Sequence, residues 1–260
     1  MTRIIMSGCS GRMGRVITDI VKNSTDAEIV AGVDVIDDGS LGYPVFSKIS
    51  DVDIDADVII DFSSAKVTDS LLDFAVEKNL PVVLCTTGLS EEQLKKVEQS
   101  SEKVAILKSA NMSLGINTII NMLKTAANVF CPAGFDVEIV EQHHHNKLDA
   151  PSGTALALAD AINEARDGEF EYIYDRSQRR EKRGAKELGI SAVRGGSIPG
   201  THDVIFAGQD EVIEIRHIAY SRSIFGNGAV NAAKFLAGKP AGMYSMADVI
   251  EAAMGGNSQE

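Results

Sequence analysis

In the first part of the chain, short apolar runs typical of buried strands alternate with stretches typical of helices. In the helical stretches, apolar residues recur three and four positions apart. One of these stretches begins with a capping-box pair, Ser90 and Gln93. Strands that alternate with helices predict an α/β fold with a parallel sheet, where ligands bind at the carboxyl ends of strands. The apolar runs lie at 1–7, 28–34, 57–62, 81–85 and 103–107.

The pattern changes after residue 114. A long helix is predicted over 115–129, and helical patterns return at 223–236 and 245–254. Closely spaced strand patterns with glycines between them indicate a second region that contains an antiparallel or mixed sheet. These strand patterns lie at 135–139, 188–193, 203–206 and 211–218.

A glycine-rich turn follows the first predicted strand and leads into a helical pattern. Its sequence is Gly8-Cys9-Ser10-Gly11-Arg12-Met13-Gly14. Strand, glycine turn and helix in this order are the context of a dinucleotide-binding motif, because the chain must turn tightly and approach a pyrophosphate. The spacing is GxxGxxG rather than GxGxxG, so a glycine pattern for helix packing is the alternative.

The second predicted strand ends in an acid, Asp34, about 20 residues after the glycine turn. At this spacing a carboxylate can meet the ribose of the cofactor. Val35 follows Asp34 and is apolar, which favours NADH, whereas Arg12 leaves NADPH use open. A turn residue at the end of a strand is the alternative for Asp34. Two further strand ends are candidates to line the nicotinamide half, at Cys85-Thr86-Thr87 and at Ser109-Ala110-Asn111-Met112.

The segment 141–154 concentrates groups that exchange protons and bind anions. Three histidines lie at 143–145, a residue type that can exchange protons near neutral pH, and Lys147 can donate a proton or hold an anion. Ser152-Gly153-Thr154 opens a helical pattern whose free N–H groups suit an anion. The alternatives are a metal site, an engineered tag or a solvated loop. The run is internal, and contiguous histidines cannot all face one ion, so we expect a catalytic anion site without a metal.

Composition limits the classes of function. The net charge of −12 argues against general nucleic-acid binding, and no run approaches the roughly 20 apolar residues of a membrane span. The odd number of cysteines, three, has no metal-binding spacing and suits a reducing cytoplasm. The chain enters a strand at once, so we expect no targeting segment and a cytoplasmic protein.

Two histidines and one basic segment lie outside these motifs. His217 alternates with Ile213 and Ile215, which favours a structural role, and the role of His202 stays open. The basic segment 176–186 is interpreted as a solvated mobile loop rather than a lid over a substrate.

Together the motifs resemble the dihydrodipicolinate reductase family. The resemblance covers the whole chain in the family's order, and the block 149–154 with its upstream histidines is the most specific part. Three positions depart from the usual pattern: Cys85 replaces a glycine and adds a thiol, Val35 replaces an arginine, and His145-Asn146 replaces a basic residue followed by histidine. The matching segments are 8–14, 86–88, 110–111, 143–154, 227–230 and 246–249.

The resemblance implies a Rossmann-like parallel-sheet domain for the dinucleotide, built from 1–113 and 223–260. It implies a second α+β domain, 114–222, with a mixed, largely antiparallel sheet that binds the substrate and forms a homotetramer. Family members use NADH or NADPH to reduce the cyclic dicarboxylate 4-hydroxy-tetrahydrodipicolinate. Water is lost and tetrahydrodipicolinate forms, in lysine and diaminopimelate biosynthesis.

The resemblance also implies residue roles. His143 corresponds to a proton donor or acceptor and Lys147 to a second proton donor. The expected substrate contacts are His144, Ser152, Gly153 and Thr154. The expected cofactor contacts are Gly8, Cys9, Ser10, Gly11, Arg12, Met13, Asp34, Cys85, Thr86, Thr87, Ser109, Ala110, Asn111 and Met112.

Three other functions are alternatives. A different nicotinamide oxidoreductase, acting on an amino acid or a sugar, accounts for the glycine turn but not for the histidine–lysine segment. A non-catalytic NAD-binding regulator gives no reason for both His143 and Lys147. A metal-dependent hydrolase predicts sensitivity to a chelator, which the reductase does not.

Overall fold

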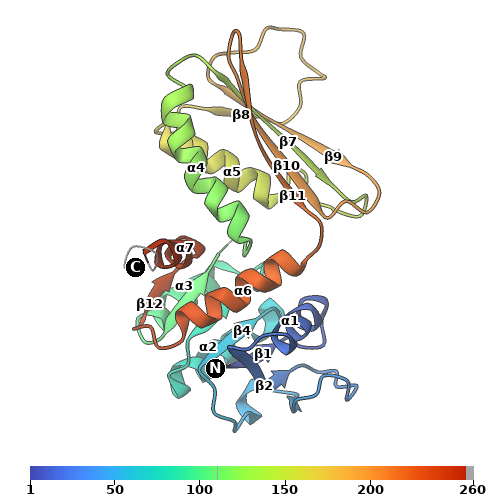
Figure 1. Ribbon diagram of the computed structural model, residues 1–260, viewed down its shortest axis with the longest axis vertical. Helices are drawn as coiled ribbons and strands as arrows, with labels where there is room; N and C mark the ends of the chain where they lie inside the picture. The colour runs from blue at the N-terminus through green and yellow to red at the C-terminus, as the bar shows by residue number, and fades with distance from the viewer. Residues whose placement is uncertain (110, 256–260) are drawn as a thin grey trace. The chain divides into compact units, whose positions relative to one another are not determined.

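The computed structural model describes residues 1–109 and 111–255. The chain forms two compact units, one made of Met1–Leu114 with Arg222–Glu260 and the other of Gly115–Ser221. The first unit holds a seven-stranded sheet in the order β12-β6-β5-β4-β1-β2-β3, and its strand pairs are parallel (Figure 1). The sheet and its covering helices confirm the predicted parallel α/β fold.

The first unit draws on both ends of the chain. Its N-terminal elements are β1 (Thr2–Ser7), α1 (Arg12–Lys22), β2 (Ala27–Val33), β3 (Val45–Phe46), the short 3₁₀ helix η1 (Ile49–Asp51), β4 (Val58–Asp61), α2 (Ala65–Lys78), β5 (Val82–Leu84), α3 (Glu91–Ser101) and β6 (Ala105–Lys108). Its C-terminal elements are α6 (Ser223–Leu236), β12 (Gly242–Tyr244) and α7 (Met246–Gly255). The predicted capping box of Ser90 and Gln93 is present at the start of α3.

Apolar residues fill both faces of this sheet. Ile4 and Met6 pack on one face with residues of α1 and α6, and Ile5 packs on the other face with residues of α2 and α3. Successive strand residues point to opposite faces, so a continuous apolar run such as 4–6 belongs to a strand covered on both sides. The pattern did not predict β3 and β12, whose two and three residues are too short for a period.

The second unit holds a five-stranded mixed sheet in the order β11-β10-β7-β9-β8. The β7–β10 and β10–β11 pairs are antiparallel, whereas the β7–β9 and β8–β9 pairs are parallel. The mixed sheet was predicted, and its parallel share follows from the crossover through α5. Its elements are α4 (Leu114–Phe130), β7 (Asp136–His143), α5 (Gly153–Ala165), β8 (Glu171–Ile173), β9 (Glu187–Arg194), β10 (Gly200–Ala207) and β11 (Val212–Ala219).

Helices α4 and α5 cover one face of this sheet (Figure 1). Leu123 of α4 and Leu158 of α5 pack with Val137 and Ile139 of β7 and Phe206 of β10. The buried residues of β7 alternate strictly through its end, so its inward row continues from Val137 and Ile139 to two polar residues. The side of β7 that packs on the apolar core therefore ends in two buried polar residues, Glu141 and His143.

The basic segment 176–186 is held to the sheet by ion pairs. Arg183 pairs with Asp136 at 2.6 Å and with Glu138 at 3.0 Å, and Arg176 pairs with Glu138 at 3.0 Å and with Glu187. The segment is a mostly exposed loop, as the sequence predicted, and carboxylates near the outer start of β7 hold two of its guanidinium groups. No helix in the part of the chain that the structure describes is long and apolar enough to cross a membrane.

Candidate active site

The glycine turn after β1 has the geometry that close approach of a pyrophosphate requires. Gly8 has a φ of +80°, and a Cβ there would lie 2.6 Å from the Phe62 carbonyl oxygen. A Cβ on Gly14 would lie 2.3 Å from the Gly8 carbonyl oxygen. A side chain at either position would force the turn away from its neighbours, so both positions need glycine.

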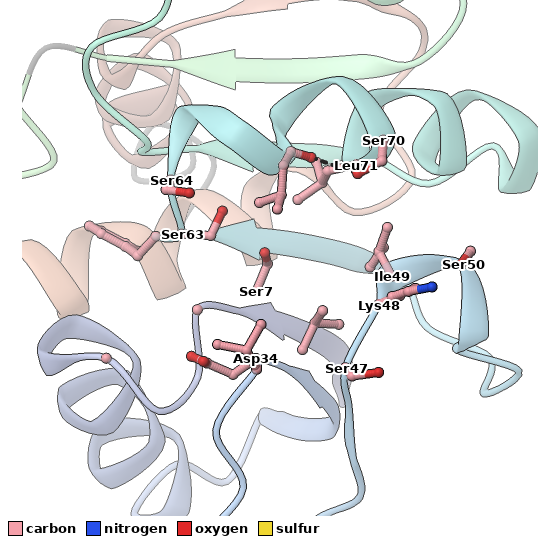
Figure 2. Close-up of a pocket in the computed structure, with 16 residues that line it drawn as sticks. Ser7, Asp34, Ser47, Lys48, Ile49, Ser50, Ser63, Ser64, Ser70 and Leu71 are labelled. Carbon is pink, nitrogen blue, oxygen red and sulfur yellow. Dashed lines mark hydrogen bonds between the residues drawn. The ribbon is translucent and has the colours of Figure 1, made fainter.

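A cavity of ≈ 430 Å³ adjoins this turn at the carboxyl ends of β1, β2 and β4 (Figure 2). Asp34 lines it, and its Oδ2 accepts a hydrogen bond from the Ser10 backbone N–H at 3.0 Å. Ser63 and Ser64 lie across the cavity from Asp34 (Figure 2). Among the predicted cofactor residues, Gly8, Gly11 and Asp34 thus share one cavity of a size and position that fit a nucleotide.

Several residues of the cavity wall could not be predicted from the sequence, among them Ser47, Lys48 and Ser50. Strand β3 pairs with the end of β2 and carries this segment to the cavity. A strand of two residues has no detectable period, so the pattern of apolar positions contains no signal that would place Lys48 near Asp34.

A buried carboxylate, Asp61, holds the loops after β4 and β5 together. Its Oδ2 accepts a hydrogen bond from the Thr86 hydroxyl at 2.6 Å, and its Oδ1 accepts one from the Ser63 backbone N–H at 3.2 Å. Thr86 is therefore fixed at its strand end, and the neighbouring Thr87 is exposed. Burial, and to a lesser degree Asp61, raises the pKa of Cys85 well above its ordinary value. A thiol with a raised pKa is protonated at neutral pH and is a weak nucleophile.

The remaining predicted cofactor residues occupy the strand ends and the first turn of α1. The side chains of Cys9 and Met112 are buried in the core, 0% and 4% exposed, so only their backbone groups can face a ligand. Ser109 Oγ donates a hydrogen bond to the Asn111 carbonyl oxygen at 2.9 Å. Arg12 and Met13 begin α1. Ala110 lies outside the described residues.

The histidine-rich segment begins on a strand rather than in a loop. His143 is the last residue of β7 and is 8% exposed. Its Nδ1 lies 2.6 Å from Oε2 of Glu141, which is fully buried two residues earlier on the same face. The strand was predicted to end at Ile139, but its alternation continues through the inward polar residues Glu141 and His143. A strand extended by this alternation would have placed Glu141 beside His143.

Glu141 also binds two other elements. Both of its oxygens accept from Arg194 of β9, at 2.8 Å and 2.7 Å, and Oε1 accepts the Ser152 backbone N–H at 3.0 Å. The sequence analysis missed Glu141 and Arg194, since the cross-strand pairing of His143 with Arg194 joins positions far apart in the chain.

The other residues of the segment are arranged around His143. The His144 backbone N–H donates to Ile198, and His145 is exposed. Lys147 Nζ lies 2.8 Å from Asp149 Oδ1, and this hydrogen bond from Lys147 lowers the pKa of Asp149. Lys147 thus keeps a nearby counter-ion, which the sequence analysis did not identify.

Ser152 is the N-cap of α5, as its position predicted. Its Oγ accepts the Ala155 backbone N–H at 3.2 Å and lies 3.1 Å from Nε2 of His202. Gly153 follows and is exposed, so the first backbone groups of α5 are open to a ligand, next to Thr154. Such a helix start favours a carboxylate.

His202, whose role stayed open in the sequence, belongs to this cluster. Strand register pairs it with Glu141 on one side and with His217 on the other. Its ring packs edge-on against that of His143, with 5.2 Å between the ring centroids. Burial lowers the pKa of His202 to about 4, so it is a neutral imidazole at pH 7. His217 is half-buried on the same face, and its structural role stays a prediction.

A dinucleotide-type parallel sheet and, in the same chain, a cluster of proton-exchanging and anion-binding groups define a nicotinamide dinucleotide-dependent reductase. Comparison with known families supports this class. Residues 2–112 match the family model for the N-terminus of dihydrodipicolinate reductase, and residues 115–250 match the model for its C-terminus. The chain belongs to the dihydrodipicolinate reductase family.

Individual relatives agree with this assignment. The chain is 51% identical to 4-hydroxy-tetrahydrodipicolinate reductase of Caldanaerobacter subterraneus subsp. tengcongensis, over 96% of this chain and 99% of the relative. It is 50% identical to the enzyme of the same name from Clostridium tetani, over 95% of this chain and 96% of the relative. The family match decides against the alternatives of a sugar or amino-acid dehydrogenase, a regulator and a hydrolase.

A solved structure shares the fold. Dipicolinate-bound dihydrodipicolinate reductase from Paenisporosarcina sp. TG-14 matches with a TM-score of 0.78 and 26% identity. The match covers 94% of this chain and 97% of that chain. The predicted combination of a Rossmann-like sheet and a second mixed sheet is therefore confirmed.

Proposed function

We propose that this protein reduces 4-hydroxy-tetrahydrodipicolinate to tetrahydrodipicolinate, with loss of water, in lysine and diaminopimelate biosynthesis. The observation that carries the proposal is the cluster in the second unit, where buried Glu141 joins His143 to the start of α5 and the charge of Lys147 acts on His143. A small cyclic dicarboxylate needs both cations and backbone N–H groups, and the solved relative with dipicolinate supports a ligand of this kind.

The residues of the second unit would manage charge and protons. When bound, NADH or NADPH supplies a hydride to the conjugated imine that remains after water has left. Hydride addition leaves negative charge on the substrate, which the Lys147 ammonium stabilises and which His143 or Lys147 neutralises with a proton. Gly153 and Thr154 would hold one substrate carboxylate, Ser152 would fix this helix start through its hydrogen bond to Glu141, and His144 would contact the substrate beside it.

The residues of the first unit would hold the dinucleotide. The turn from Gly8 to Met13 lies against the pyrophosphate, and Asp34 accepts hydrogen bonds from the ribose hydroxyls. Cys85, Thr86, Thr87 and the segment 109–112 contribute to the nicotinamide half. These assignments rest on the fit of the glycine turn and on the cavity beside Asp34.

The cofactor preference that we propose is for NADH. Asp34 repels a 2′-phosphate, and Val35, 86% exposed, offers it no positive charge. Lys48 lines the same cavity and is exposed, which gives NADPH a partial counter-charge and keeps its use open. We expect NADH to be preferred without being exclusive.

The domain roles and assembly that we propose follow the family. The first unit binds the dinucleotide, and the second binds the substrate and forms the contacts of a homotetramer. We expect the protein to act in a reducing cytoplasm.

The sheet face away from α4 and α5 exposes three apolar side chains, Val193, Val212 and Ile218, at 46%, 58% and 42%. Apolar exposure of this kind is typical of an interface between subunits. Light scattering should give the mass of a tetramer, and a monomer at assay concentration would contradict this assembly.

The decisive assay follows oxidation of NADH and NADPH by ultraviolet absorbance. The substrate is made in situ by its synthase from pyruvate and aspartate semialdehyde. We expect substrate-dependent oxidation of both cofactors, faster with NADH. A folded protein that binds NADH but turns over neither cofactor would refute the proposed reaction.

His143→Ala should lower kcat by roughly 10²–10⁴-fold, the usual contribution of a general acid or base. NADH affinity, measured by fluorescence, should change little because His143 belongs to the second unit. His145→Ala is the matched control, since this neighbouring histidine is exposed and should retain turnover. An equal loss of NADH binding in His143→Ala would count against a proton-transfer role.

Val35→Arg should raise the ratio of kcat/KM for NADPH to that for NADH by roughly tenfold, the worth of one charge-assisted hydrogen bond to a phosphate. Val35→Gln, of similar length without the charge, is the control and should change the ratio much less. Steady-state kinetics with both cofactors measure this. An unchanged ratio in Val35→Arg would mean that residue 35 does not face the 2′ position.

A further inference from the structure

A single buried carboxylate connects the proposed proton donor to the proposed substrate cradle. Glu141 has no exposed surface, and four donors converge on its two oxygens. Oε2 takes His143 Nδ1 at 2.6 Å and Arg194 Nη1 at 2.8 Å, and Oε1 takes Arg194 Nη2 at 2.7 Å and the Ser152 backbone N–H at 3.0 Å.

We propose that Glu141, charge-balanced by Arg194, is a positioning residue that fixes His143 as the Nδ1–H tautomer and leaves Nε2 to exchange the proton with the substrate. The inference deepens the proposed function and rests on it. Glu141 itself does not touch the substrate; it acts through His143 and through the start of α5.

The donors around Glu141 require it to be ionised. Burial alone raises its pKa, but the hydrogen bonds from Arg194, His143 and Ser152 outweigh burial and leave the pKa below its ordinary value. A carboxylate only accepts hydrogen bonds, so His143 must donate from Nδ1. The Nε2 atom is then the nitrogen that is left for the substrate.

The space beside Nε2 supports this choice. Gly200 of β10 lies next to the ring, and a Cβ there would sit 3.1 Å from His143 Nε2. The φ of Gly200 is not in the left-handed region, so its backbone alone does not require glycine. A side chain at position 200 would crowd the nitrogen that exchanges the proton.

Charged and titratable groups face His143 from every neighbouring element. Glu141 is on its own strand, Lys147 with Asp149 on the following segment, Arg194 on β9 and the neutral His202 on β10, with His217 beyond it. Burial lowers the pKa of His143, Glu141 raises it, and Lys147 and Arg194 lower it, for a net value below the ordinary one. A dianionic substrate would oppose the two cations and favour the imidazolium that donates the proton.

Glu141→Gln tests the inference because an amide separates the two tasks of the carboxylate. Its oxygen can still accept the Ser152 N–H, so the cradle persists. Its NH₂ then takes the place of Oε2, loses the hydrogen bond from Arg194 Nη1 and donates to His143 Nδ1, which stabilises the Nε2–H tautomer and disfavours the imidazolium. We expect kcat to fall at least about tenfold, as for other carboxylates that orient a histidine, with a much smaller change in substrate KM.

Two readouts go beyond a general loss of structure. Nitrogen-15 NMR of the five histidines should show His143 as Nδ1–H in the wild type and as Nε2–H in Glu141→Gln. The rate requires protonated His143 and falls as pH rises through its pKa. Glu141→Gln should therefore move this alkaline limb to lower pH. Arg194→Met, which removes a cation, should move it to higher pH.

Glu138→Gln is the matched control. Glu138 lies on the same strand and also pairs with two arginines, Arg176 and Arg183, but it faces away from His143. It should keep the wild-type kcat, tautomer and pH profile.

The outcomes separate this inference from the proposed function. A wild type without turnover would refute the function, whereas the NMR tautomer tests Glu141 independently of activity. An unchanged tautomer and kcat in Glu141→Gln would overturn the role of Glu141. If that variant does not fold, Arg194→Met decides, and an alkaline limb that stays in place or moves to lower pH would overturn the inference.

Discussion

The arrangement of the second unit depends on the compensation of one buried charge. Burying a carboxylate is costly unless it is fully hydrogen-bonded and paired. Glu141 meets this condition through Arg194, His143 and the Ser152 backbone N–H, which come from β9, β7 and the start of α5. Loss of any partner would leave part of the buried Glu141 carboxylate without compensation. The need to compensate this charge therefore fixes the positions of β7, β9 and the start of α5 relative to one another.

The first unit uses the same device. Asp61 is buried at the end of β4 and joins the loop that begins α2 to Thr86 after β5. In both units a carboxylate at the end of a central strand organises loops where a ligand is expected. The apolar core beneath provides rigidity, and the polar strand end provides the specific contacts.

In the proposed function, both units would bind anions with backbone groups. The start of α1 follows a turn in which side chains at Gly8 or Gly14 would clash, and the start of α5 presents an exposed Gly153. A protein with a net charge of −12 cannot rely on its overall field to attract a dinucleotide and a dicarboxylate. In the proposed function, helix starts and a few local cations, such as Lys147, would supply the attraction at short range.

The sequence by itself determined the parallel sheet, the glycine turn, the capping of α3 and α5 and the family, because these depend on local periods and on contiguous motifs. It also identified His143 and Lys147, whose chemistry is visible in one segment. Only the tertiary structure decided that Glu141, Arg194 and His202 surround His143, and that Lys48 shares a cavity with Asp34. Those contacts come from strand register and from short strands, which join residues distant in the chain and leave no local period.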